Sequence, residues 1–276
     1  MNTMFDFMDH IQVQKEPGLE QYRGEDGLIY CGKCHTPVQC LIRFAGKERI
    51  MPCICKCQKE ERERQEQRMK EEEQLLYVRR LKAAGIQERH LQDWTFASAT
   101  DTPSIQMAKR YTENWKKVKA ENLGLLLWGD VGTGKSFLAA CIANALLEKG
   151  VPVLMTNFSK ILNQMGAMYS DERYRYIASF NRFSLLIIDD LGIERNTEYA
   201  LEQVYAVIDE RYKTGLPLII TTNLTISQLR NPEDVAHARI YSRVLEMCTP
   251  VHVPGHDRRT TIGKSKQELV KEVLFS

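Results

Sequence analysis

The segment Trp128-Gly129-Asp130-Val131-Gly132-Thr133-Gly134-Lys135-Ser136 matches the pattern G-x-x-x-x-G-K-[ST] at every fixed position. An apolar run, 123–128, precedes it and a helix-like run, 137–149, follows it. Glycines in the segment let the backbone turn tightly and bring its N–H groups close to phosphate oxygens, and the following helix points its positive end at them. The alternative is an ordinary glycine-rich turn, which these flanking runs disfavour. The segment therefore predicts a phosphate-binding loop.

Side chains in this loop have separate expected roles. We expect the residues from Gly129 to Ser136 to bind ATP as a group. The Lys135 ammonium is expected to reach the β- and γ-phosphates, and the Ser136 hydroxyl to hold Mg²⁺.

Two further apolar runs end in polar residues. The run 184–188 is followed by Asp189 and Asp190, and its continuous branched side chains predict a strand buried on both faces of a parallel sheet. Beside a phosphate-binding loop, Asp189 is expected to orient Mg²⁺ and Asp190 to polarise the attacking water. The run 216–220 leads to Asn223, whose amide is expected to contact the γ-phosphate or that water.

Alternating strands and helices predict an α/β fold, a doubly wound parallel sheet flanked by helices, with ligands at the carboxyl ends of the strands. The polar residues at 136, 189–190 and 223 are then expected to converge.

Arginines near the end of the chain offer further candidates. Arg239 and Arg243 stand four residues apart on one face of the helix predicted over 233–248. They are either solvated surface arginines or include an arginine finger for the γ-phosphate of a neighbouring subunit. Arg258 and Arg259 follow the strand-like 251–253, and either could turn toward the nucleotide.

The first informative segment of the chain is cysteine-rich. Cys31 and Cys34 form a C-x-x-C pair, and Cys53, Cys55 and Cys57 follow after a predicted hairpin. Four thiolates from two such pairs would close a tetrahedral zinc site. We expect Cys31, Cys34, Cys55 and Cys57 to be the ligands, with Cys53 as the alternative for the third place. Such a short segment buries little apolar surface, so the metal would be its main source of stability.

Three other readings of these cysteines are weaker. A histidine follows the first pair, as in haem attachment, but that modification belongs to exported proteins. A redox C-x-x-C of the thioredoxin type needs a βαβ setting that the segment lacks. Unliganded thiols are the third reading.

Composition and length frame the organisation. The chain has 276 residues, enough for about two domains, and its 38 basic and 36 acidic residues argue neither for nor against nucleic acid. The sequence contains neither an apolar run long enough for a membrane nor a secretion signal at 1–14, so we expect a cytoplasmic protein with reduced thiols and no membrane contact.

We expect three parts: a zinc-binding module at 1–57, a charged helical linker at 58–104 and the ATPase domain at 105–276. Good helix formers with opposite charges three and four apart predict a solvated helix over 58–82. Trp94 and Phe96 either cover a bound adenine or anchor the linker on the core, and the anchor is the better expectation.

A last candidate is a mixture of aromatic and cationic residues over 168–176. Arg173, Tyr174 and Arg175 suit stacking on bases and pairing with phosphates of single-stranded DNA. An amphipathic helix whose tyrosines pack on the core is an equally favoured interpretation of this segment.

The order of these motifs resembles a bacterial or prophage replicative helicase loader of the DnaC family. These are AAA+ ATPases related to the transposition helper IstB and the initiator DnaA. The motifs that carry the resemblance are the two cysteine pairs, the phosphate loop, 185–192 (LLIIDDLG), 221–223, 239–243 and 255–259. The resemblance covers nearly the whole chain and is weakest before residue 28.

The resemblance implies roles for individual residues. Asp189 and Asp190 would be Walker B and Asn223 sensor 1. Arg243 would be the arginine finger, with Arg239 beside it. Arg259 would be sensor 2 and contact ATP, although Asp257 stands where the family has a serine, so the choice between Arg258 and Arg259 stays open.

The resemblance also implies partners. The zinc module would contact the replicative helicase of the DnaB type. The ATPase domain would bind single-stranded DNA and self-assemble with ATP into a ring or spiral. Hydrolysis is expected to be slow in the monomer, because the finger comes from a neighbour. Two other functions stay open: an IstB-type transposition helper, and a zinc-dependent DNA-binding regulator that holds nucleotide as a structural ligand.

Overall fold

The computed structural model describes residues 16–44, 46–192, 197–255, 257, 270–271 and 273–274. The chain divides into two compact units, Met1–Leu75 and Leu76–Ser276, and helix α2 (Lys56–Gly85) contributes residues to both. Within the part that the structure describes, no helix combines the length and the apolar character needed to span a membrane.

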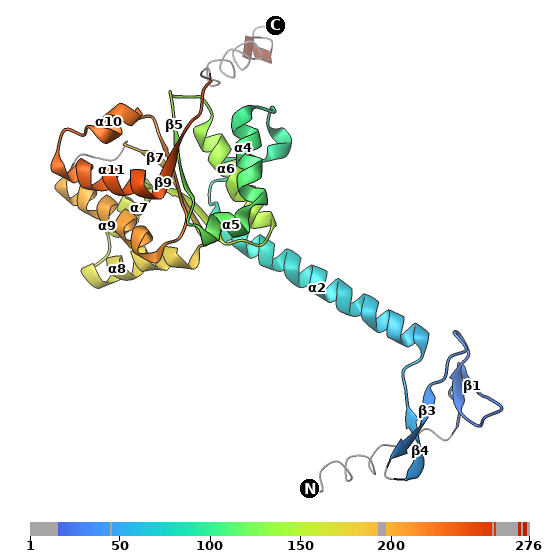
Figure 1. Ribbon diagram of the computed structural model, residues 1–276. Coiled ribbons are helices and arrows are strands. Elements are labelled where there is room, and N and C mark those ends of the chain that lie inside the picture. Colours follow the sequence, from blue (N-terminus) through green and yellow to red (C-terminus); the bar gives the residue numbers. More distant parts are fainter. Residues whose placement is uncertain are drawn as a thin grey trace. The chain divides into compact units, whose positions relative to one another are not determined.

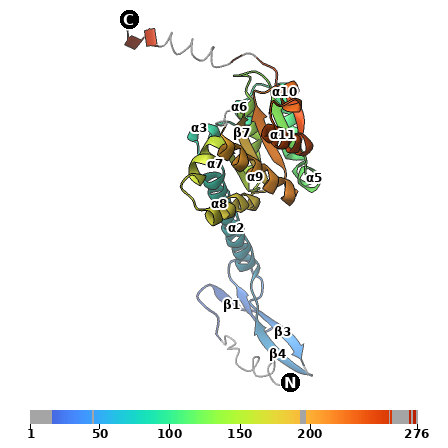
Figure 2. The ribbon, with the colours of Figure 1, turned by 90° about the vertical axis from the view of Figure 1, so that its left-hand side faces the viewer.

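The first unit contains two antiparallel hairpins. Strand β1 (Gln21–Arg23) pairs with β2 (Ile29–Cys31). Strand β3 (Gln39–Phe44) pairs with β4 (Lys47–Pro52), and Figure 2 shows these two side by side. The second hairpin agrees with the one predicted between the cysteine pairs. One link to the first is the buried Gln39 side chain, whose Oε1 accepts a hydrogen bond of 3.1 Å from the Ile29 N–H.

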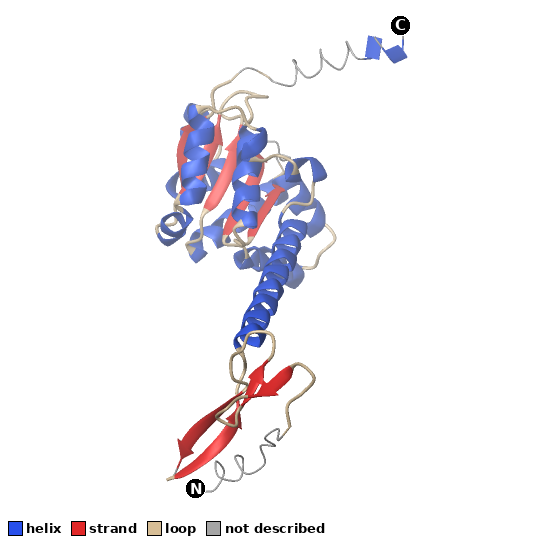
Figure 3. Ribbon diagram, turned by 90° about the vertical axis from the view of Figure 1, so that its right-hand side faces the viewer, coloured by secondary structure: helices blue, strands red, loops and turns tan. Residues whose placement is uncertain are grey.

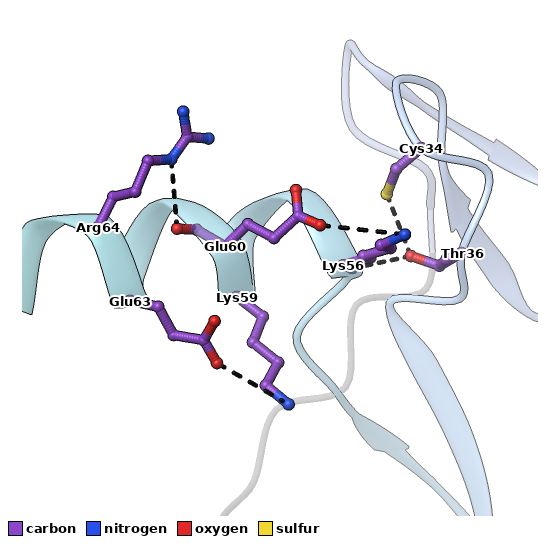
Figure 4. A network of polar contacts seen from close by, with 7 residues as sticks. All are labelled: Cys34, Thr36, Lys56, Lys59, Glu60, Glu63 and Arg64. Atoms are coloured by element: carbon purple, nitrogen blue, oxygen red, sulfur yellow. Dashed lines mark hydrogen bonds and ion pairs between the residues drawn. The ribbon is translucent and has the colours of Figure 1, made fainter.

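Helix α2 confirms the predicted charged helix, with the end corrected. Its first half is exposed and carries ion pairs one turn apart, such as Lys59 with Glu63 and Arg62 with Glu66 (Figure 4 shows the first of these). Each such pair stabilises a helix by only about 0.3–0.5 kcal/mol. The helix continues to Gly85, past the predicted end at residue 82, because its last turns pack on the second unit through Leu81.

The second unit is built on a five-stranded sheet with the order β6-β7-β8-β5-β9, in which every neighbouring pair is parallel. This confirms the predicted α/β fold. The strands are β5 (Gly124–Trp128), β6 (Val153–Asn157), β7 (Leu185–Leu191), β8 (Leu218–Thr222) and β9 (Cys248–His252).

Helices cover both faces of the sheet (Figures 1 and 3). Alternate strand residues point to opposite faces, so Leu186 and Ile188 pack with one helix layer and Leu185 and Ile187 with the other. One layer contains α4 (Pro103–Glu113), α5 (Trp115–Ala120) and α6 (Lys135–Glu148). The other contains α7 (Phe158–Met165), α8 (Ser170–Ser179), α9 (Glu198–Thr214), α10 (Ile226–Arg230) and α11 (Val235–Met247). The short elements are α3 (Arg89–Gln92), η1 (Phe96–Ser98) and η2 (Phe180–Arg182).

A buried arginine closes the amino end of the sheet. Arg211 in α9 is 1% exposed and donates hydrogen bonds to the carbonyls of Phe183, Ser184 and Pro217, which precede β7 and β8. Burial lowers the pKa of this guanidinium to about 10. The polar residues of the candidate site lie at the opposite, carboxyl edge of the sheet.

Candidate functional site

The glycine-rich loop connects β5 to α6 at the carboxyl edge of the sheet. Gly129, Gly132 and Gly134 have φ angles of 147°, 78° and 98°, a region that favours glycine. Gly134 is the residue before the first turn of α6, so the free N–H groups of that turn face the loop. The loop therefore has the backbone conformation and the helix end that a phosphate group requires.

Lys135 brings this loop into contact with a distant strand end. Its side chain is buried, and its Nζ donates to the carbonyls of Gly129 and Asp130 at 2.9 and 2.7 Å. The same Nζ donates to Oδ1 of Asn223 at 2.7 Å. The structure thus joins two residues that the sequence separates by 88 positions.

The Walker B candidates lie on the strand next to Asn223. Thr221 donates its hydroxyl hydrogen to Oδ1 of Asp189 at 2.6 Å and accepts the Asp190 N–H at 2.9 Å. Burial raises the pKa of the Asp189 carboxyl, the hydrogen bonds from Thr221 and Ser136 oppose this, and the charges of Asp190 and Glu88 raise it further. A half-buried carboxylate that is followed by a second carboxylate is a suitable ligand for a divalent cation.

The backbone at Asp190 departs from regular strand geometry. Its φ is 58°, and the pairing of β7 with β8 shifts register between Ile188 and Leu191. The Thr222 hydroxyl donates to the Leu191 carbonyl at 2.7 Å and so holds the strand beyond the irregularity. A left-handed non-glycine residue costs about 1–3 kcal/mol, and such strain is commonly found at functional sites.

A cavity of about 480 Å³ lies beside the loop. Thr133, Gly134 and Phe137 form one side of it, and the segments 100–107 and 251–254 contribute the rest. Trp94 and Phe96 do not line this cavity. They pack against the core, and the Trp94 ring lies 5.6 Å from the Phe137 ring, as expected for residues that anchor the linker.

Arg243 and Arg239 have different surroundings. Arg243 forms an ion pair of 2.8 Å with Oδ1 of Asp209, donates to the Tyr205 hydroxyl at 2.9 Å, and lies over the Tyr212 ring. Arg239 is exposed and lines the same open groove as Arg243. Both are therefore on the surface, and Arg243 is held by its own chain. The sensor 2 candidates Arg258 and Arg259 lie outside the described residues.

The cysteine cluster contains the four favoured ligands. The Sγ atoms of Cys31, Cys34, Cys55 and Cys57 all lie within 4.8 Å of one another. Cys53 is not in this group, and its thiol donates to the Pro37 carbonyl at 3.4 Å. Four cysteine sulfurs at such distances match the donor set of a structural zinc site.

Local hydrogen bonds shift the pKa values of two thiols in the cluster in opposite directions. The Thr36 hydroxyl, 3.1 Å from Sγ of Cys34, lowers the pKa of that thiol to about 5 (Figure 4). Hydrogen bonds with the neighbouring thiols raise the pKa of Cys57 to about 12. The same Thr36 oxygen accepts the Lys56 N–H at 2.9 Å, which fixes the start of α2 against the cysteine turn.

The proposed DNA contacts lie on α8. Tyr174 is 70% exposed, whereas Tyr176 packs edge-on against Phe180 in the core layer. Arg173 lies over the ring of Tyr199 at 5.3 Å and Arg175 is exposed. The helix thus has a packed tyrosine, as in the amphipathic alternative, and two exposed residues, Tyr174 and Arg175, next to the half-buried Arg173.

The fold and the loop together define a P-loop ATP-binding protein of the AAA+ class. The chain belongs to the family of IstB-like ATP binding proteins, which it matches over residues 56–266.

Two known relatives are similar to the chain in sequence, and one solved structure is similar to it in fold. The replicative helicase loader DnaI of Bacillus subtilis (strain 168) is 28% identical over 162 residues, which are 55% of this chain and 50% of that protein. The replicative helicase loader DnaC of Escherichia coli (strain K12) is 22% identical over 167 residues, 58% of this chain and 67% of that protein. A crystal structure of DnaI superimposes with a TM-score of 0.51 at 24% identity, covering 62% of this chain and 94% of that one.

These similarities confirm the resemblance to helicase loaders and to IstB that the motifs predicted. The match spans only half the length of DnaI, and the structural match supports the fold.

Proposed function

We propose that the protein is an ATP-dependent helicase loader in DNA replication. The observation that carries the proposal is its similarity to the replicative helicase loader DnaI, combined with the contact between Lys135 and Asn223 beside the phosphate loop. A loader needs a site whose geometry changes with the bound nucleotide, and a lysine shared between the loop and a neighbouring strand end is suited to such a change.

ATP binds with its phosphates in the loop 129–136 and its adenosine in the adjoining cavity. Lys135 exchanges its carbonyl acceptors for the β- and γ-phosphate oxygens. Ser136 and Asp189 hold Mg²⁺, which neutralises charge on the phosphates when bound. Asp190 accepts a proton from the attacking water, and Asn223 donates its amide N–H to the γ-phosphate or to that water.

Slow hydrolysis that depends on assembly follows from the position of Arg243. As an arginine finger it acts on the γ-phosphate of a neighbouring subunit, so it must leave Asp209 and Tyr205 when chains assemble into a ring or spiral. Fingers of this kind in GTPases accelerate hydrolysis by about 10³–10⁵. Arg239 lies beside it, and Arg259 or Arg258 completes the site as sensor 2.

The N-terminal module docks on the replicative helicase, of the DnaB type. Zinc held by Cys31, Cys34, Cys55 and Cys57 stabilises the module in the reducing cytoplasm, where we place the protein. The exposed cross-strand pair Leu41 and Ile50 on the second hairpin supports a docking role, since apolar side chains there gain by being covered.

The ATPase domain binds single-stranded DNA through the outer face of α8, where Arg173 and Arg175 pair with phosphates and Tyr174 stacks on a base. Replacing both arginines by alanine is expected to weaken ATP-dependent binding of a labelled oligothymidylate at least about tenfold, measured by fluorescence anisotropy.

The matched control for this variant removes two positive charges elsewhere. Lys116→Ala with Lys117→Ala on α5 is expected to leave the affinity for the oligonucleotide close to that of the unaltered protein. Unchanged affinity in the Arg173→Ala, Arg175→Ala variant would show that α8 is a structural helix only.

The second candidate function is a transposition helper of the IstB type, which the family match favours by name. That match begins at residue 56, so the cysteine cluster lies largely outside it. An additional docking module suits the loader better than the helper. The two functions differ in the protein partner, a replicative helicase in one case and a transposase in the other.

A further inference from the structure

The segment that follows α2 extends the edge of the sheet. Ile86 forms a parallel bridge with Met155 of β6, the edge strand, and is completely buried. A side chain on Gly85 would place its Cβ 2.1 Å from the Val153 carbonyl oxygen, so the approach requires glycine at that position. The Gln92 amide donates to the Ile86 carbonyl at 2.6 Å and fixes the segment from its other side.

The register of this bridge places Glu88 on the same level as Asp189, with β6 between them. Ile86 lies opposite Met155, so Glu88, two residues further, is level with Asn157. Asn157 in turn pairs with Asp189 in β7. Neighbouring strands lie about 4.8 Å apart, which places the backbones of Glu88 and Asp189 on the order of 10 Å from each other.

A lysine of α7, the helix that follows β6, neutralises the charge of Glu88. The Lys160 ammonium forms an ion pair with Oε1 of Glu88. Lys160 is fixed at the start of α7, because its backbone N–H donates to the capping Oδ1 of Asn157 at 2.9 Å. The imidazole of His90 lies 3.4 Å from the other oxygen of Glu88. The side chains of Glu88 and Lys160 are each about one-third exposed, so solvent screens the electrostatic field of these two charges only in part.

We propose that Glu88 and Lys160 tune the Mg²⁺ affinity of the nucleotide site in opposite directions. The proposal rests on the proposed function, because it requires Mg²⁺ at Asp189. A carboxylate at this distance makes the potential at the metal more negative and so favours the cation, and the ammonium of Lys160 cancels that contribution. Glu88 and Lys160 thereby act on the nucleotide site as a pair with opposite effects.

The test compares ATP binding with and without the metal in the full chain. The measured quantity is the Kd of a fluorescent ATP analogue in EDTA divided by its Kd in excess Mg²⁺. Glu88→Gln is expected to lower this ratio by about two- to fivefold, and Lys160→Gln to raise it by a similar factor. The double variant is expected to return close to the ratio of the unaltered protein, since the two changes of charge cancel.

The matched control breaks another ion pair between the same linker and the core. Lys82 of α2 lies 3.0 Å from Glu148 at the far end of α6, so Glu148→Gln removes a tether without changing the charge near Asp189. Its ratio is expected to be unchanged.

Three outcomes would overturn the proposal. Shifts of both single variants in the same direction, or a double variant that stays shifted, would show that the pair acts only on the structure. Normal ratios in both single variants, with Mg²⁺ dependence intact in the unaltered protein, would refute the tuning and leave the proposed function standing. An unaltered protein whose ATP binding ignores Mg²⁺ would refute the assignment of the metal site as well.

Discussion

Replacing Lys135 by alanine is expected to raise the Kd for MgATP at least about 100-fold. A charge-assisted hydrogen bond contributes about 1.5–3 kcal/mol, and this ammonium is the cation buried in the loop itself. Isothermal titration calorimetry of the full chain measures the change directly. The variant also leaves Oδ1 of Asn223 without its donor, so the position of the strand end no longer depends on the loop.

The matched control is Lys149→Ala. Lys149 also donates to a backbone carbonyl, that of Thr112 at 2.8 Å, but it lies just beyond the other end of α6. Its loss is expected to leave the Kd within about twofold. Tight ATP binding by a folded Lys135→Ala variant would mean that the loop does not bind phosphate.

Removing the metal from the cysteine cluster is expected to unfold the N-terminal module. Structural zinc sites of this kind supply about 10–16 kcal/mol of apparent binding free energy, and two short hairpins have little core to replace it. The purified full chain is expected to contain a stoichiometric amount of zinc, which the Cys34→Ser variant lacks. Limited proteolysis should then cut that variant between residues 16 and 55, while its ATPase domain still binds nucleotide.

Two cysteines outside the cluster provide the controls for this experiment. Cys53→Ser and Cys40→Ser are expected to retain both zinc and resistance to proteolysis, because neither thiol belongs to the group of four. Loss of zinc from Cys53→Ser, or its retention by Cys55→Ser, would contradict the assigned ligand set.

Much of the nucleotide site was predictable because its residues follow local rules. The glycine positions of the loop fix a backbone that few other sequences adopt, and apolar runs that end in acid or amide mark the carboxyl edge of a parallel sheet. Asp189 and Asn223 could therefore be assigned to one edge before any distance was known. The sequence left Cys53 and Cys55 as alternatives, and in the structure the sulfur of Cys55, not that of Cys53, lies in the group of four.

Contacts between residues far apart in the chain were not predictable. The hydrogen bond from Thr221 to Asp189 and the ion pair of Glu88 with Lys160 depend on how the strands are ordered, which a sequence pattern does not specify. The same holds for the three carbonyls that Arg211 binds, since a buried arginine looks like any surface arginine on a charged helix. The attachment of Arg243 to Asp209 is a further case.

The central claim is that this ATPase delivers a replicative helicase, and the partner it captures tests that claim most directly. The full chain, loaded with zinc and ATP, would serve as bait in a lysate of the source cells, with bound proteins identified by mass spectrometry. The account predicts recovery of the replicative helicase by the unaltered protein and its loss from the Cys34→Ser variant. Recovery of a transposase without the helicase would contradict the account and establish the transposition helper instead.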